Sequence, residues 1–178
     1  MRMNRLALRV CVLGGSAACA LLIAACVPTR PVPTPVEFVI VRHAEKGNDD
    51  PRDPQLTAAG LARAQRLAAS LASAPLAAAY ATSYRRTRQT ATPSAAGHAL
   101  AVTTYDAKQD AGEFAAALRQ RHASGTVLVV GHSNTVPAIA AALCACAVAP
   151  IGDDEYDRRL RVRFDGRGSA TLSDARMP

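Results

Sequence analysis

Two short apolar runs most constrain how this chain can fold. Val36 to Val41 is apolar except at Glu37, and Thr126 to Val130 is the clearest strand pattern in the sequence. Continuous apolar runs of this length are typical of strands that are buried on both faces, as in a parallel sheet covered by helices. Each run ends in a polar pair, Arg42-His43 after the first and Gly131-His132 after the second.

The rest of the domain alternates between helix and strand patterns. Thr57 is a candidate N-cap for a helix with Leu61, Ala64, Leu67, Ala68 and Leu71 on one face. Helices are expected over 58–73, 84–92 (ended by Pro93), 110–121 and from Asn134 to Leu143, and strands over 76–81, 100–104, 160–164 and 170–172. The alternation predicts an α/β three-layer sandwich with a mostly parallel central sheet and helices on both faces.

The N-terminal segment has the pattern of an export signal. Arg2, Arg5 and Arg9 precede an uncharged apolar run over 10–25, which matches the basic and apolar regions of a signal peptide and is short for a transmembrane helix. Ile23-Ala24-Ala25-Cys26 resembles the bacterial lipobox. The resemblance implies a lipoprotein signal peptide over 1–25 and lipidation of Cys26, with plain secretion as the alternative.

A proline-rich segment separates this leader from the first strand. Residues 26–35 begin at Cys26 and continue with alternating proline and small or polar residues, which favours an extended tether. Since Val27, and no Asp, follows the cysteine, we expect an outer-membrane location facing the periplasm. The folded domain is then 36–178, and the 178 residues with 49% hydrophobic content suit one such domain.

Charge and cysteine usage exclude several classes of function. The formal charge of +7 is clustered, with Arg85, Arg86 and Arg88 close together, and aromatic residues are scarce. This distribution suits a small anion better than nucleic acid, which needs a basic stripe with stacking aromatics. Cys144 and Cys146 do not have zinc-ligand spacing, so we interpret both as small core residues and expect no metal.

The polar pairs predict a phosphate-handling site. Arg42-His43 and Gly131-His132 follow strands, and ligands of parallel sheets bind beyond the carboxyl ends of strands. A neutral imidazole can attack phosphorus, and arginine can stabilise the phosphoryl oxygens. Arg86 lies early in the helix after the second strand, while the Thr82 and Ser133 hydroxyls precede helices.

Three separated blocks resemble the histidine phosphatase superfamily, in its phosphoglycerate-mutase-like branch. They are Arg42-His43-Ala44-Glu45, the stretch from Thr82 to Ala91 (TSYRRTRQTA) and Val130-Gly131-His132-Ser133, and LTAAG over 56–60 resembles the family's helix entry. The resemblance implies that His43 is phosphorylated, that Arg42, Arg86 and His132 hold the phosphate, and that an acid protonates the leaving group. Asp106 is our first choice for that acid, since it follows the third strand. Ala44 stands where the family most often has glycine.

The sequence therefore predicts a phosphatase, with no cofactor, that acts on a small phosphorylated substrate or a phosphoprotein in the bacterial cell envelope. It contacts the membrane only through its lipid anchor and binds no nucleic acid. Hydrolysis of phosphate monoesters or of phosphohistidine is expected, through a phosphohistidine on His43. The alternative is a non-catalytic lipoprotein that binds phosphorylated ligands, or a protein partner, in the same pocket.

Overall fold

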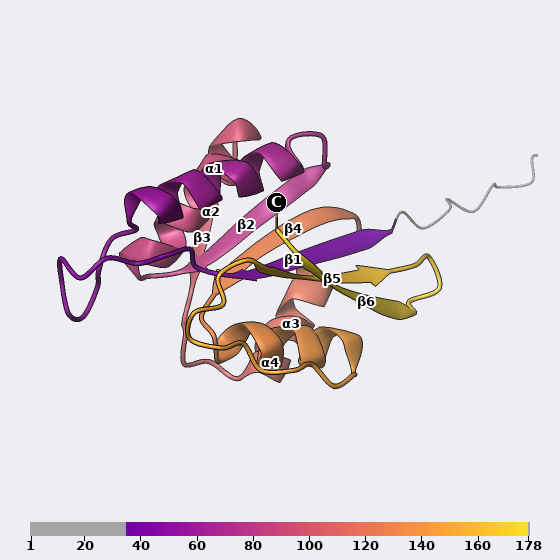
Figure 1. The fold of residues 1–178 in the computed structure, drawn as a ribbon. Helices are drawn as coiled ribbons and strands as arrows, with labels where there is room; N and C mark the ends of the chain where they lie inside the picture. The colour runs from indigo at the N-terminus through magenta and orange to yellow at the C-terminus, as the bar shows by residue number, and fades with distance from the viewer. Residues whose placement is uncertain (1–34, 178) are drawn as a thin grey trace, which may run out of the picture. The chain divides into compact units, whose positions relative to one another are not determined.

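A six-stranded sheet forms the centre of the domain in the computed structural model, which describes residues 35–177 (Figure 1). The strands are β1 (Val36–Arg42), β2 (Leu76–Thr82), β3 (Val102–Tyr105), β4 (Gly125–Gly131), β5 (Arg158–Phe164) and β6 (Ala170–Arg176), in the order β3-β2-β4-β1-β5-β6. Strands β1 to β4 pair in parallel, whereas β5 and β6 are antiparallel additions at one edge. The predicted mostly parallel α/β fold is confirmed.

Helices cover both faces of this sheet, as predicted (Figure 1). Helices α1 (Ala58–Leu71) and α2 (Arg85–Gly97) pack on one face, and α3 (Ala111–Arg121) and α4 (Thr135–Cys144) pack on the other. Because β1 and β4 lie in the middle and are buried on both faces, alternate residues of each strand enter the two core layers. Among the described helices, none is long and apolar enough to cross a membrane.

Helix α1 begins as the sequence predicts. Thr57 is its N-cap and accepts a hydrogen bond from the Gly60 amide at 3.1 Å. A side chain at Gly60 would clash with the Glu45 carbonyl oxygen, so glycine lets the helix start lie against the chain that follows β1. Ala64, Leu67 and Leu71 face the core as expected, whereas Ala68 is half-buried and Leu61 is exposed.

Helix α2 does not end at Pro93, contrary to the prediction. It continues to Gly97, with Pro93 inside it. Proline removes one backbone hydrogen bond, but Ser94 and Ala95 lie beyond it on the buried side of the helix. The packing of Ala91 and Ala95 on the sheet therefore keeps this part of the chain helical.

Cys144 and Cys146 form a disulfide, which corrects the interpretation of both as small core residues. Helix α4 ends at Cys144, and Ala145 adopts a left-handed conformation with φ of 52°. This turn brings the two Cα atoms to 5.2 Å, within the range that a disulfide spans. Cys146 is exposed, whereas Cys144 is half-buried and packs against the core, so the pair lies at the edge of the core where the helix ends.

The leader and tether predicted over 1–35 lie outside the described residues, except for Pro35. The described chain enters the sheet at the amino end of β1, at Val36, and leaves this strand at Arg42. Strand β1 thus places Val36 about 20 Å from the carboxyl edge of the sheet.

Candidate phosphate-binding site

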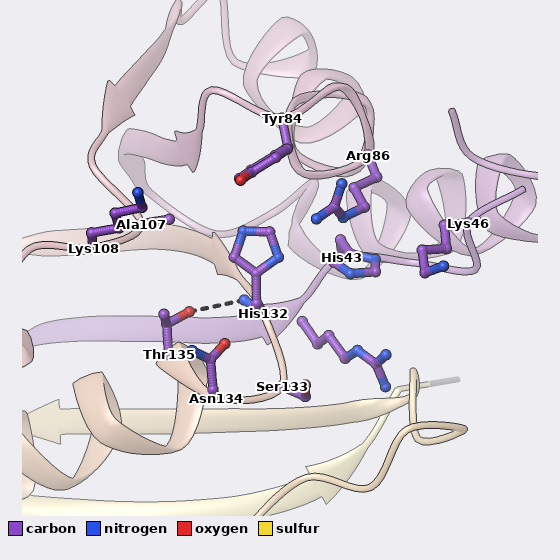
Figure 2. Close-up of a pocket in the computed structure, with 11 residues that line it drawn as sticks. His43, Lys46, Tyr84, Arg86, Ala107, Lys108, His132, Ser133, Asn134 and Thr135 are labelled. Atoms are coloured by element: carbon purple, nitrogen blue, oxygen red, sulfur yellow. Dashed lines mark hydrogen bonds between the residues drawn. The ribbon is translucent and has the colours of Figure 1, made fainter. Parts of the chain in front are cut away.

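The four predicted pocket residues meet at the carboxyl edge of the sheet. Arg42 is opposite Gly131 in the pairing of β1 with β4, so His43 and His132 follow neighbouring strand ends. Their ring centroids are 5.5 Å apart. Arg86 comes from the first turn of α2, which follows the adjacent strand β2. All four line one cavity of about 390 Å³ (Figure 2).

His43 is buried and held in one tautomer. Its side chain is 4% exposed, and Nδ1 lies 2.8 Å from the Ala44 carbonyl oxygen. Because a carbonyl only accepts, Nδ1 carries the hydrogen and Nε2 keeps its lone pair. Burial, followed by the charges of Arg86, His132 and Arg42, lowers the pKa of His43 to about 3. The ring is therefore a neutral base at neutral pH.

His132 is oriented by a buried hydroxyl. Its Nε2 lies 3.1 Å from Thr82 Oγ1, and Thr82 Oγ1 lies 2.8 Å from Thr87 Oγ1. Thr82 is fully buried, so it supports His132 from behind. Burial, with the charges of Arg86 and Arg42, lowers the pKa of His132 to about 4. With Nε2 engaged by Thr82, Nδ1 is the ring nitrogen left for a ligand.

The two arginines have buried nitrogen atoms with no hydrogen-bond partner in the described part of the chain. These are Nε of Arg42, and Nε and NH1 of Arg86. NH1 of Arg86 is near Asp53, but at 3.7 Å from its carboxylate the contact is an ion pair and not a hydrogen bond. Buried donors without partners are costly, because they lose their water without replacing it. Their presence in one pocket indicates a binding site for an anion.

Arg42 is fixed by the loop over residues 152–155. NH1 of Arg42 donates to the carbonyl oxygens of Gly152 at 2.8 Å, Asp153 at 2.7 Å and Glu155 at 3.3 Å. Backbone carbonyls have no sequence signature, so this contact could not be found from residue types. It leaves the rest of the guanidinium available to the pocket.

Lys46, Lys108 and Tyr84 also line the pocket, and Figure 2 shows the two lysines on opposite sides of the His43 and His132 pair. The sequence patterns did not single out Lys108 or Tyr84, although each residue follows the end of a strand, β3 and β2 respectively. Neither lysine is buried, so both can move to meet a ligand.

Of the remaining predicted residues, some lie at the pocket and others lie outside it. Ser133 lines the pocket, and Thr82 supports it from behind. Asp106 is exposed and lies outside the pocket lining, where its carboxylate accepts a hydrogen bond from the Lys108 amide at 2.9 Å. Glu45 also faces elsewhere, because both of its oxygens accept from Arg63 Nε at 3.0 Å. Among the described residues that line the pocket, none is a carboxylate.

His98 and His122 are half-buried and lie away from the pocket. His98 Nε2 is 3.0 Å from the Leu71 carbonyl oxygen, and His122 Nε2 is 2.9 Å from the Tyr80 hydroxyl. In the described part of the chain, no three His, Cys, Asp or Glu residues are grouped as metal ligands.

The sequence of residues 38–112 matches the family model described as histidine phosphatase superfamily, branch 1. Over these residues the chain is similar to that superfamily. The matched segment contains His43 and Arg86 but ends before His132, which the fold brings beside His43. No curated protein gives a significant match to this sequence.

Solved structures of other proteins share the fold. A mycobacterial glucosyl-3-phosphoglycerate phosphatase has a TM-score of 0.64 and 14% identity, covering 81% of this chain and 100% of its own. The protein histidine phosphatase SixA, complexed with tungstate, has a TM-score of 0.61 and 19% identity over 79% and 96% of the two chains. A phosphoserine phosphatase from Entamoeba histolytica, bound to 3-phosphoglyceric acid, has a TM-score of 0.60 and 14% identity over 78% and 95%.

Proposed function

We propose that this chain is a metal-independent phosphatase that hydrolyses phosphate monoesters or phosphohistidine through a phosphohistidine intermediate on His43. The observation that carries the proposal is the hydrogen bond from His43 Nδ1 to the Ala44 carbonyl, because it leaves the Nε2 lone pair beside unpartnered guanidinium groups. The names of the structural neighbours, which include a glucosyl-3-phosphoglycerate phosphatase, a phosphoserine phosphatase and a protein histidine phosphatase, support the same reaction class.

In the first step, Nε2 of His43 attacks phosphorus and the bond to the leaving group breaks. Arg42, Arg86 and His132 Nδ1 surround the equatorial oxygens, whose negative charge persists through the transfer. The pocket is lined by four cationic side chains, which supply this stabilisation without any rearrangement of water. In the second step, water attacks the phosphohistidine, inorganic phosphate leaves and His43 becomes neutral again.

The pocket favours leaving groups that depart without a strong acid. Its described lining contains lysine and hydroxyl groups but no carboxylate, and Asp106 would have to move to reach the scissile bond. Aryl phosphates lose a weakly basic phenolate, and phosphohistidine loses a neutral imidazole once its other ring nitrogen carries a proton from solvent, so neither needs a strong acid in the pocket. We therefore expect faster turnover of these substrates than of alkyl phosphates.

Hydrolysis of an aryl phosphate in the presence of a chelator tests the proposal. The chain should release phosphate, and His43→Ala should abolish the release, since the nucleophile is lost. A His98→Ala variant is the matched control, because His98 is remote from the pocket and should leave the rate unchanged. A non-catalytic binder of phosphorylated ligands would bind phosphate in both variants and hydrolyse nothing in either.

We also propose that the enzyme is anchored in the cell envelope through a lipid on Cys26. The sequence of the leader supports this location. Fractionation of a Cys26→Ser variant tests the anchor: the variant should leave the membrane fraction, and its retention there would refute lipidation.

A further inference from the structure

A second cavity adjoins the phosphate pocket between α3 and α4. Its volume is about 340 Å³. Residues that line both cavities form a shared wall, which consists of Ala107, Lys108, Asn134 and Thr135. Beyond this wall the lining is largely apolar and comes from β3, α3 and α4, with Tyr105, Ala111, Phe114, Ala138 and Ile139. We call this cavity the α3–α4 cleft.

The polar residues of the cleft lie toward solvent. Asp106 and Gln109 are exposed, whereas Phe114 is 5% and Ile139 is 2% exposed. The cleft therefore has an apolar floor and a polar rim, which is the usual composition of a site for a small organic group. Thr135 forms part of its connection to the site, because Thr135 Oγ1 accepts a hydrogen bond from the His132 amide at 2.9 Å.

The cleft lies on the side of the pocket to which a leaving group would depart. Figure 2 shows Ala107 and Lys108 on the far side of His132 from His43. In phosphoryl transfer the nucleophile and the leaving group are roughly in line, with phosphorus between them. A phosphate attacked by His43 therefore directs its organic group toward the wall that the pocket shares with the cleft.

We propose that the α3–α4 cleft binds the apolar part of the substrate's leaving group, an aryl or branched alkyl group that carries the phosphate. This inference rests on the proposed phosphatase function and adds a substrate class to it. Lys108 lies at the boundary, where its ammonium group can contact the phosphate while Phe114 and Ile139 contact the organic group.

Two phosphonates that cannot be hydrolysed test the cleft separately from the chemistry. Methylphosphonate carries only the anionic head group, whereas benzylphosphonate adds an aromatic ring that would occupy the cleft. Calorimetric titration of the whole chain should show benzylphosphonate binding about tenfold more tightly, because its ring loses contact with water. The ratio of the two affinities is the measured quantity.

Ala138→Trp should fill the cleft. Ala138 is exposed on α4, so the larger side chain can be accommodated without disturbing the core. The variant should bind methylphosphonate as the wild type does and lose the preference for benzylphosphonate. Ala142→Trp is the matched control, because Ala142 is exposed one turn further along α4 and does not line the cleft. It should keep the preference.

The outcomes separate the two proposals. Equal affinities for both phosphonates in the wild type, or a preference for benzylphosphonate that persists in Ala138→Trp, would refute the proposal that the cleft binds the organic group. Either result would leave the proposed phosphatase function unaffected. Absence of binding of either phosphonate to the wild type would overturn both. If Ala138→Trp also loses binding of methylphosphonate, the smaller substitution Ala138→Leu decides. This variant must keep its affinity for methylphosphonate and bind benzylphosphonate more weakly than the wild type does. Any other result contradicts the inference.

Discussion

The ring of Tyr156 lies 4.2 Å from the guanidinium carbon of Arg42 and 6.0 Å, between centroids, from the ring of His43. Tyr84 contacts Arg86 and His132 in the same way. Its ring centroid lies 4.3 Å from the guanidinium carbon of Arg86 and 5.3 Å from the ring centroid of His132. Each pocket arginine is thus stacked on a tyrosine that also contacts a pocket histidine. Stacking restricts the guanidinium before the phosphate arrives, which reduces the entropy lost on binding.

Replacement of Tyr156 should weaken substrate binding more than it slows the chemistry. Cation–π contacts contribute about 0.5–2 kcal/mol, so Tyr156→Leu should raise KM by about two- to thirtyfold with kcat little changed. Tyr156→Phe keeps the ring and should restore the wild-type KM. Steady-state kinetics on an aryl phosphate measure both constants. A Phe variant as impaired as the Leu variant would show that the hydroxyl, and not the stacked ring, is responsible.

Removal of the hydroxyl behind His132 should impair the site without changing its shape. Thr82→Val has nearly the same volume and deletes the contact between Oγ1 and His132 Nε2. A buried hydrogen bond contributes about 1 kcal/mol, and the imidazole left unpaired costs more, so kcat/KM should fall by about tenfold. Thr92→Val is the control, because Thr92 is exposed on α2 and outside the pocket. An unchanged kcat/KM in Thr82→Val would mean that His132 needs no support from Thr82.

Burial of His43 should make the protein sensitive to acid. The pKa of His43 falls from 6.5 to about 3 on folding, so between these values the unfolded chain binds more protons than the folded one. The free energy of unfolding should therefore decrease as the pH falls through this window, by up to about 1.4 kcal/mol per pH unit. The loss begins near pH 6.5 and is complete below about pH 3.

Urea unfolding of the wild type and of His43→Asn, at a series of pH values, measures this effect. Asn can still donate to the Ala44 carbonyl but does not titrate, so its stability should fall less steeply. Part of the slope should persist, because His132 titrates near 4 in the folded protein. Identical slopes in the two proteins would contradict the low pKa of His43.

The close contact between Gly60 and Glu45 should make this glycine essential to stability. A Cβ at Gly60 meets the Glu45 backbone, so Gly60→Ala should destabilise the fold by about 1–3 kcal/mol through overpacking. The matched variant is Gly97→Ala, because Gly97 is the last residue of α2 and has no atom within 4 Å of its Cβ position. Alanine there should be neutral or stabilising in the same thermal unfolding experiment. An equal loss of stability at both positions would contradict the explanation that Gly60 is required by its contact with Glu45.

The sequence was sufficient to predict the parts of the site that are positioned by the ends of strands. Apolar runs locate β1 and β4, and the parallel pairing places whatever follows them at one edge, so the proximity of His43 and His132 was predictable. The N-cap of α1 at Thr57 was equally clear, since capping depends on residues within one turn.

The parts that could not be predicted depend on contacts between distant segments. The loop at 152–156 reaches Arg42 through backbone carbonyls and Tyr156, which no local pattern encodes. Pro93 remains inside α2 because packing on the sheet outweighs the local preference for an end there. Asp106 lies outside the pocket because of a turn in which the backbone amide of Lys108 donates a hydrogen bond to the Asp106 carboxylate. The spacing of residues in the sequence does not predict this turn.

The most direct test of the account is to trap the phosphorylated enzyme. Rapid quenching in alkali during turnover, followed by mass spectrometry of peptides, should find phosphate on Nε2 of His43, stable in base and labile in acid. The position on Nε2 is expected because Nδ1 is occupied by the Ala44 carbonyl. Turnover of substrate with no phosphate on His43, or with phosphate on another residue, would contradict the central claim.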